Sequence, residues 1–171
     1  MHTMNRWLRI LKHRAFDETD TRRAIGPAVA ARLQQRVRDS ERKHSGEIRV
    51  CVEAGLPLSY LWRDADARER AIAMFSKLGV WDTEENNGVL IYLLLAEHRI
   101  EIVADRGLKP HVSAEQWRTI ADEMSVAFRD GAMETGLARA IDAVDALLRR
   151  HFPAIEGAAD VNELPDAPTL Q

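Results

Sequence analysis

Apolar residues recur along this chain at two spacings, one typical of helices and one typical of strands. Val29, Leu33 and Val37 lie four residues apart, so they share one face of a helix. Ile48 and Val50 instead alternate with polar neighbours, as residues of a strand do. Along the chain these patterns predict a helix at 27–43, a strand at 47–53, a linker at 54–63, a helix at 64–78, strands at 88–96 and 99–105, and helices at 113–129 and 132–150.

The predicted strand at 88–96 organises these elements. It is apolar at almost every position, which is typical of a strand covered by helices on both faces. The turn at 97–98 is too short for a crossover, so the strand at 99–105 should return antiparallel. The helical connection from 47–53 allows a parallel pair. We therefore expect a single α/β domain of three layers, α/β/α, with a small mixed sheet flanked by helices.

Two segments lie outside this predicted domain of residues 27–150. Residues 1–26 are expected to form a basic amphipathic helix, over residues 4–14, and a linker. That helix either packs back on its own domain or frays, or else it docks on a membrane surface or a partner through the face that carries Trp7. Residues 151–171 are acidic, contain prolines and lack Lys and Arg, which favours an extended or disordered tail. We favour a wrapped terminus over a binding peptide.

The composition narrows the class of function. The chain of 171 residues is 46% hydrophobic, enough for one sizeable core, and its net formal charge of -3 argues against nucleic acid as a partner. No apolar run reaches the roughly 18 to 20 residues of a membrane span, and the basic N-terminus lacks the apolar core of a signal peptide. We expect a cytoplasmic protein, or one peripheral to the inner membrane face, in which Cys51 is a small buried residue.

The strand order points to a candidate cation site. The two parallel strands begin, and the antiparallel strand ends, at one edge of the sheet, so three segments should converge there. The candidate metal ligands that they carry are Glu47, Asp82, Glu84, Glu85, Asn86 and Asp105. Oxygen ligands of this kind suit calcium or magnesium. The alternative is an ordinary solvated turn in which Arg106 pairs with Asp105.

Other catalytic patterns are missing from the sequence. The six histidines are scattered without the spacing of a zinc site, and no phosphate-binding glycine-rich loop or Gly-x-Ser-x-Gly motif occurs. Nucleophilic catalysis is therefore not supported.

Several runs of the chain resemble the TPM domain family, and they occur in the family's order. They are Ser-Gly-Glu-Ile-Arg-Val at 45–50, Phe-Ser-Lys-Leu-Gly-Val-Trp at 75–81, Asn-Asn-Gly-Val-Leu-Ile at 86–91, Arg-Ile-Glu-Ile-Val-Ala-Asp-Arg-Gly-Leu at 99–108 and Phe-Arg-Asp-Gly at 128–131. The resemblance covers residues 27–150, most of the chain.

The resemblance implies an α/β/α domain with a cleft at the sheet edge. The family's acidic residue before Asn-Gly falls at Asp82, Glu84 or Glu85, and its loop after the third strand falls at 105–107. Some relatives bind divalent cations, and a thylakoid member is described as an acid phosphatase. Many relatives are exported or carry a membrane span and a glycine-rich tail, features that are not expected here. Many also read Gly-Tyr-Gly where this chain has Asp-Arg-Gly.

Two functions follow as hypotheses. The favoured one is a divalent-cation-binding interaction or regulatory module, with an unidentified protein partner and a peripheral membrane contact through residues 4–14. The alternative is a metal-assisted phosphatase acting on phosphomonoesters. In that enzyme the cation would polarise a phosphoryl oxygen, Arg106 would steady the phosphate, and a carboxylate such as Asp105 would orient water.

Overall fold

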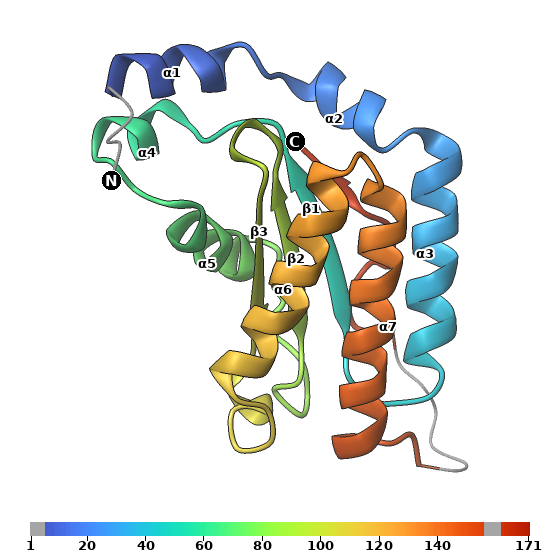
Figure 1. Ribbon diagram of the computed structural model, residues 1–171. Coiled ribbons are helices and arrows are strands. Elements are labelled where there is room, and N and C mark those ends of the chain that lie inside the picture. The colour runs from blue at the N-terminus through green and yellow to red at the C-terminus, as the bar shows by residue number, and fades with distance from the viewer. Residues whose placement is uncertain (1–5, 156–161) are drawn as a thin grey trace.

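A four-stranded mixed sheet forms the centre of the protein, with helices on both of its faces (Figure 1), in a computed structural model that describes residues 6–155 and 162–171. The elements are α1 (Arg6–Arg14), α2 (Glu18–Ala24), α3 (Pro27–Glu41), β1 (Ile48–Glu53), α4 (Leu58–Trp62), α5 (Ala67–Lys77), β2 (Val89–Leu94), β3 (Arg99–Ala104), α6 (Ala114–Arg129), α7 (Met133–His151) and β4 (Thr169–Leu170). Short 3-10 turns at Leu95–Glu97 and Arg106–Leu108 follow β2 and β3. The expected α/β/α architecture is confirmed.

The strands lie in the order β3-β2-β1-β4. β1 and β2 are parallel, with Ile48 opposite Val89, and α5 lies in the connection between them. β2 and β3 are antiparallel, with Val89 opposite Ala104, because the turn between them is short. β4 adds to the free side of β1 in parallel, so the two outer strands of the sheet are β3 and β4.

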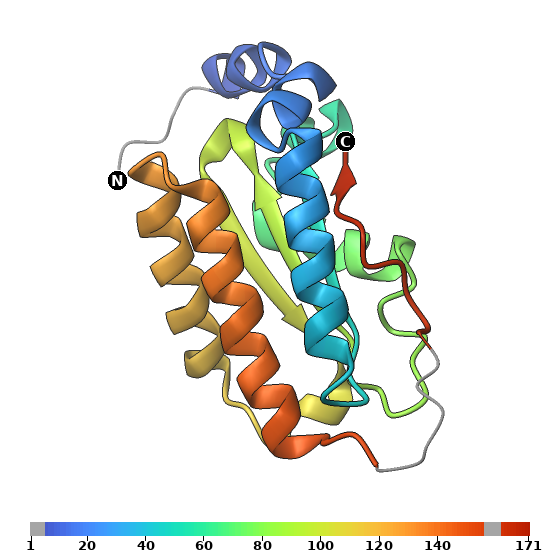
Figure 2. The same cartoon turned by 90° about the vertical axis from the view of Figure 1, so that its right-hand side faces the viewer.

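Side-chain alternation divides the core into two layers. Ile48, Val50 and Val52 belong to the larger cluster, which also takes apolar residues of α3, α6 and α7. Cys51 and Tyr92 belong to the second cluster, with residues of α5. The two views in Figures 1 and 2 show α3, α6 and α7 side by side on one face. Cys51 is a buried structural residue, as expected, and burial raises the pKa of its thiol to about 12.

α1, α2 and α4 lie near one end of the sheet (Figure 2). Asp17 caps α2, because its side chain accepts a hydrogen bond from Thr19 N at 2.8 Å. The prediction of a linker at 54–63 is wrong over α4. This short helix begins after Pro57 and buries Leu61, so tertiary packing rather than helix propensity accounts for it.

The C-terminal segment wraps onto the sheet. In the described residues 162–171, β4 pairs with β1, and Gln171 N donates to Val52 O at 2.9 Å. The expected wrapped terminus is confirmed over this range, although the sequence did not predict a strand there. The part of the tail at 156–161 lies outside the described residues.

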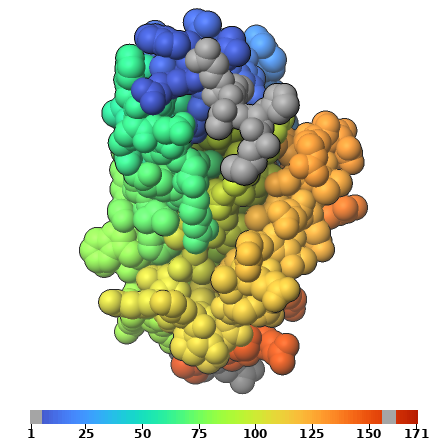
Figure 3. Space-filling model, turned by 60° about the vertical axis from the view of Figure 1, so that its left-hand side comes forward, coloured from blue at the N-terminus to red at the C-terminus, as the bar shows by residue number. Residues whose placement is uncertain are grey.

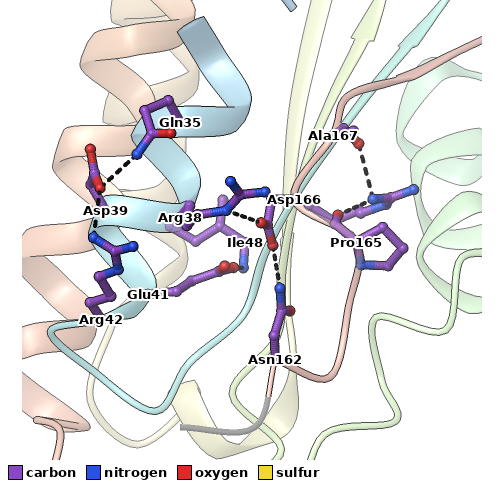
Figure 4. Close-up of polar contacts among 11 residues, drawn as sticks. Gln35, Arg38, Asp39, Glu41, Arg42, Ile48, Asn162, Pro165, Asp166 and Ala167 are labelled. Carbon is purple, nitrogen blue, oxygen red and sulfur yellow. Dashed lines mark hydrogen bonds and ion pairs between the residues drawn. The ribbon is translucent and has the colours of Figure 1, made fainter. Parts of the chain in front are cut away.

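Buried polar contacts hold the tail beside β1. The Arg49 guanidinium donates to Pro165 O, and it also binds Ala167 O at 3.0 Å and Thr169 Oγ1 at 2.7 Å. Figure 4 shows Asp166 between the side chains of two other residues. These are Arg38, with Nε 3.1 Å from Oδ2, and Asn162, with Nδ2 2.6 Å from Oδ1.

Candidate functional site

Three segments of the chain meet at the end of the sheet where β1 and β2 begin. Val89 N donates to Glu47 O at 2.8 Å, which joins the starts of the two parallel strands. Asp105 N donates to Gly88 O at 2.9 Å, which joins the end of β3 to the start of β2. The structure therefore contains the main-chain convergence that the strand order predicts.

Two glycines allow the segments to touch. A Cβ atom at Gly88 would lie 2.1 Å from Val80 O, and one at Gly107 would lie 2.5 Å from Asn86 O. Gly107 N also donates to Asn86 O at 2.8 Å, so the loop after β3 is bonded directly to residues 80–87 before β2, which we call the acidic loop. Larger residues at either position would separate these main chains.

The same close packing keeps two predicted ligands apart. Glu47 and Asp105 occupy the positions on either side of Gly88 across the three strands. The main chain of Val80 fills the space directly over Gly88. Glu47 is buried and accepts a hydrogen bond from Glu163 N at 2.9 Å on the tail side. Burial raises the pKa of Glu47, although this hydrogen bond opposes the shift.

The other predicted carboxylates turn away from this pair. Glu85 Oε2 accepts hydrogen bonds from Ser45 Oγ at 2.6 Å and from Asn87 Nδ2 at 3.3 Å. Asp82 and Glu84 are exposed. Across residues 6–155 and 162–171, no group of three or more Asp, Glu, His or Cys side chains is arranged so that it could hold a metal ion. As arranged, the candidate ligands do not fit a cation.

The alternative ion pair is also not formed. Asp105 Oδ1 accepts from the main-chain N–H of Arg106 at 2.7 Å. The Arg106 guanidinium instead donates from Nε to Asn86 Oδ1 at 3.1 Å. The predicted pairing of the Arg106 and Asp105 side chains is therefore wrong, because the turn directs the guanidinium towards the acidic loop.

Some buried oxygens at this end of the sheet lack a hydrogen-bond partner among the described residues. They are Glu47 Oε2, Asn87 Oδ1 and Asp105 Oδ2. Buried acceptors of this kind are normally satisfied by water or by an ion. They keep the calcium or magnesium site open as a prediction, although the described carboxylates are not grouped as metal ligands.

A groove of about 530 Å³ runs from Asp105 along β3, between α5 and α6. Figure 3 shows the groove as a strip with β3, in yellow-green, at its floor, between α5 in green and α6 in orange-yellow. Its lining residues are Arg68, Glu101, Ile102, Ala104, Asp105, Arg106, Lys109, Val112, Ala114, Trp117, Arg118 and Ala121. The sequence pointed only to Asp105 and Arg106 among them. The rest come from three separate segments. The signal that could have found them is the prediction that β3 is an outer strand, because helices that cover the two faces of a sheet flank its outer strand.

The groove is more basic than the rest of the protein. Four of its lining residues are Arg or Lys and two are acidic, whereas the whole chain carries a net formal charge of -3. Lys109 and Arg118 are exposed and form no ion pair with any residue that the structure describes. The groove therefore presents positive charge to an incoming ligand.

A second surface stands out at the other end of the molecule. We define the α1–α4 patch as the exposed apolar residues of these two contacting helices, which are Trp7, Leu8, Leu11, Leu58 and Trp62. The indole rings of Trp7 and Trp62 are 5.6 Å apart in an edge-to-face arrangement. Only four other large apolar side chains of the described residues are exposed, and they are scattered. The patch is therefore a local concentration of apolar surface.

The opposite face of α1 is fixed to the domain. His13 Nε2 lies 2.9 Å from Glu97 Oε1, while His13 Nδ1 accepts a hydrogen bond from Leu56 N at 2.9 Å. Arg9 Nε donates to the same Glu97 oxygen at 2.7 Å. Burial alone would raise the pKa of Glu97, but the His13 and Arg9 hydrogen bonds lower it to about 2. Within the described residues, α1 packs back on its own domain, as one of the two predictions has it.

Comparison with known proteins places this fold among solved structures. The model of the TPM domain matches residues 19–147. The NMR structure of BA42 from the psychrophilic bacterium Bizionia argentinensis is 28% identical, with a TM-score of 0.73, over 85% of this chain and 94% of that one. The N-terminal domain of a P. gingivalis protein is 22% identical, with a TM-score of 0.55, and the match covers 77% of this chain and 82% of that one. No curated protein matches the chain.

Proposed function

The chain belongs to the TPM domain family, and from that premise we propose that it is an interaction module that docks on an anionic membrane surface through the α1–α4 patch. Among the described residues no helix is long and apolar enough to cross a membrane. The proposed contact is therefore with the surface of the bilayer, at the inner face where anionic lipids are concentrated.

One observation carries this proposal: α1 is anchored on one face and apolar on the face that it exposes. Ile10 and His13 are buried against the domain. The side chains of Trp7 and Leu11 remain 61% and 65% exposed. A short helix that served only to pack on its domain would need no such outer face.

The charge around the patch favours a lipid surface. Arg6, Lys12 and Arg14 are exposed on the same helix as Trp7 and Leu11. Each basic residue near an anionic surface contributes about 1 kcal/mol, and burial of a Leu or Trp side chain contributes roughly 2 kcal/mol. A symmetric dimer through the same patch would instead bring these basic residues against one another.

Sedimentation with lipid vesicles tests the proposal. The protein should bind vesicles that contain phosphatidylserine and not vesicles of phosphatidylcholine alone. A Trp7→Ser, Leu11→Ser double variant should lose at least about tenfold in affinity, because it removes the exposed apolar anchor. Trp81→Ser is the matched control. Trp81 is 53% exposed, but it lies in the acidic loop and is not part of the α1–α4 patch.

Two results would contradict the proposal. One is wild-type protein that stays in the supernatant with phosphatidylserine vesicles. The other is an equal loss of binding in Trp81→Ser and in the double variant. A concentration-dependent dimer that the double variant abolishes would assign the patch to a second copy instead.

The cation and the phosphatase remain separate predictions. Unpartnered buried oxygens at Glu47, Asn87 and Asp105 support a cation, while the dispersal of the carboxylates opposes a preformed site. Asp105 and Arg106 both line the groove, which is what supports the enzyme hypothesis. Metal-dependent hydrolysis of a phosphomonoester that is lost in Asp105→Asn would support it, and activity that survives this change would point to another site or a contaminant.

A further inference from the structure

β3 is an outer strand whose free side is not covered by another strand in the described structure. Asp105 N donates to β2, so in an antiparallel ladder the main chains of Ile100, Ile102 and Ala104 turn to the other side. Arg68, which lines the groove, confirms this direction, because its guanidinium donates a hydrogen bond of 2.5 Å to Ile102 O. The remaining outward N–H and C=O groups have no partner among residues 6–155 and 162–171.

The groove beside this strand is lined by both apolar and basic side chains. α6 and the loop before it contribute apolar side chains, among them Val112, Trp117 and Ala121. Basic side chains, including Lys109 and Arg118, stand at its rim. A strand that paired with β3 would turn its side chains alternately to one face of the sheet and to the other. One set would face α6 and the loop before it, which carry both the apolar side chains and Lys109 and Arg118, and the other set would face Arg68 of α5.

We propose that the open edge of β3 binds an extended acidic segment of another protein as an added strand. Three outward-facing residues of β3 match a segment of about five residues, since every second residue of a strand faces its neighbour. In the bound state Arg68 exchanges Ile102 O for a carboxylate of the segment. The edge carbonyl then accepts a main-chain N–H of the added strand.

The protein already binds a segment of this chemistry at its opposite edge. Residues 162–171 include two carboxylates and no basic residue, and they lie extended beside β1 with Arg49 holding their main-chain oxygens. Pairing of β3 with β3 of a second copy would bring two basic grooves together, which charge repulsion opposes. The site is distinct from the α1–α4 patch, and its test uses no lipid, so either proposal can fail without the other.

Calorimetric titration with synthetic peptides tests this site. The probe is a capped hexapeptide of alternating glutamate and valine, compared with its lysine–valine counterpart. We expect the acidic peptide to bind at least about tenfold more tightly. Methylation of the amide nitrogens on one side of the peptide should weaken binding by a similar factor, because it removes the donors of an added strand while the charge is kept.

Variants of the protein locate the site. Ala104→Pro removes an outward N–H and no ladder bond, so it should abolish binding with little loss of stability. Because proline could disturb the strand, the Lys109→Glu, Arg118→Glu double variant gives a second test, with an expected loss of about tenfold. Arg129→Glu, an exposed change at the end of the same helix as Arg118, should bind as the wild type does.

Three outcomes would overturn the proposal. The first is an absence of binding by the acidic peptide at millimolar concentration. The second is equal affinity for the methylated peptide, which would mean attraction by charge without strand pairing. The third is concentration-dependent self-association that the peptide does not reverse and that Ala104→Pro abolishes, which would assign the edge to a second copy.

Discussion

The two edges of the sheet differ in how their main-chain groups are satisfied. Beside β1 the chain supplies its own outer strand, β4, and Arg49 is 8% exposed while it binds main-chain oxygens of the tail. At the β3 edge a single guanidinium, from Arg68, caps one outward carbonyl, and its side chain is 47% exposed. One edge is sealed by buried contacts, whereas in the described part of the chain the other is capped at one carbonyl by a half-exposed arginine side chain.

The two edges should therefore contribute to different properties of the protein, the sealed edge to stability and the open edge to binding. Changes at the sealed edge remove buried partners, so they should lower the free energy of unfolding. Changes at the open edge remove groups that face solvent in the free protein, so they should affect binding more than stability. The following substitutions test this division, beginning with the largest expected effect.

Replacement of Arg49 should cost most. Arg49→Ala leaves the carbonyls of Pro165 and Ala167 without their donor in a partly buried position, and a loss of about 2 to 4 kcal/mol follows from such groups. Urea denaturation measures the change. Arg22→Ala, an exposed arginine with one helical ion pair, should change the free energy of unfolding by less than about 0.5 kcal/mol. Equal losses in both variants would contradict the sealed edge.

A matched pair of prolines compares the two edges directly. Ala54 N donates to Gln171 O at 2.8 Å, so Ala54→Pro breaks a bond that joins the tail to the sheet. Ala104→Pro breaks no ladder bond, because the N–H of Ala104 faces the groove. We expect losses of about 1 to 3 kcal/mol for the first and under about 1 kcal/mol for the second. The reverse order in thermal or urea unfolding would show that the β3 edge is the more constrained.

The pH dependence of stability should report the sealed edge as well. Burial raises the pKa of Glu41 from 4.5 to about 9, and the nearby charges of Glu47 and Asp166 add to the shift. A raised carboxyl pKa means that the contribution of Glu41 is complete below pH 4.5 and is lost as the pH rises towards 9. Ile48 N donates to Glu41 Oε1 at 2.9 Å, a bond that glutamine can keep.

Glu41→Gln should therefore raise the melting temperature at pH 8 to 9, by a few degrees as a rough measure, and have little effect near pH 4. Glu115→Gln, an exposed change on α6, controls for net charge. A wild type and a Glu41→Gln variant with the same melting temperature at every pH would exclude this titration.

Calcium or magnesium should have the smallest effect. Because the described carboxylates are not grouped as metal ligands, we expect weak binding, and a millimolar ion near its dissociation constant would add only about 0.4 kcal/mol of stability. The expected result is a small rise in melting temperature with shifted amide signals at residues 82–88. Unchanged signals with both ions would reject the cation site.

Much of the fold could be predicted because the patterns were strong. The apolar run of β2, the short turn before β3 and the capping box at Ser113 each depend on neighbours in sequence. β4 could not be predicted in this way. Its two residues pair with Cys51 and Val52 of β1, and Thr169 also binds Arg49, which in the sequence is only a polar position of an alternating strand.

The candidate site shows the same limit. Strand order correctly placed Glu47, the acidic loop and Asp105 at one end of the sheet. It did not show that Val80 lies over Gly88, or that Glu85 turns to Ser45, because these depend on contacts across 8 and 40 residues. The resemblance implied a cleft at the sheet edge, but most of the groove's lining was missed for a similar reason, since Arg68 and Arg118 come from helices on its two sides.

Amide hydrogen exchange tests the contrast between the two edges most directly. With saturating acidic hexapeptide, the amides of Ile100, Ile102 and Ala104 should exchange at least about tenfold more slowly, while the amide of Ala54 at the sealed edge keeps its rate. Unchanged exchange at the three β3 amides, or equal slowing at Ala54, would contradict an open edge that accepts an added strand.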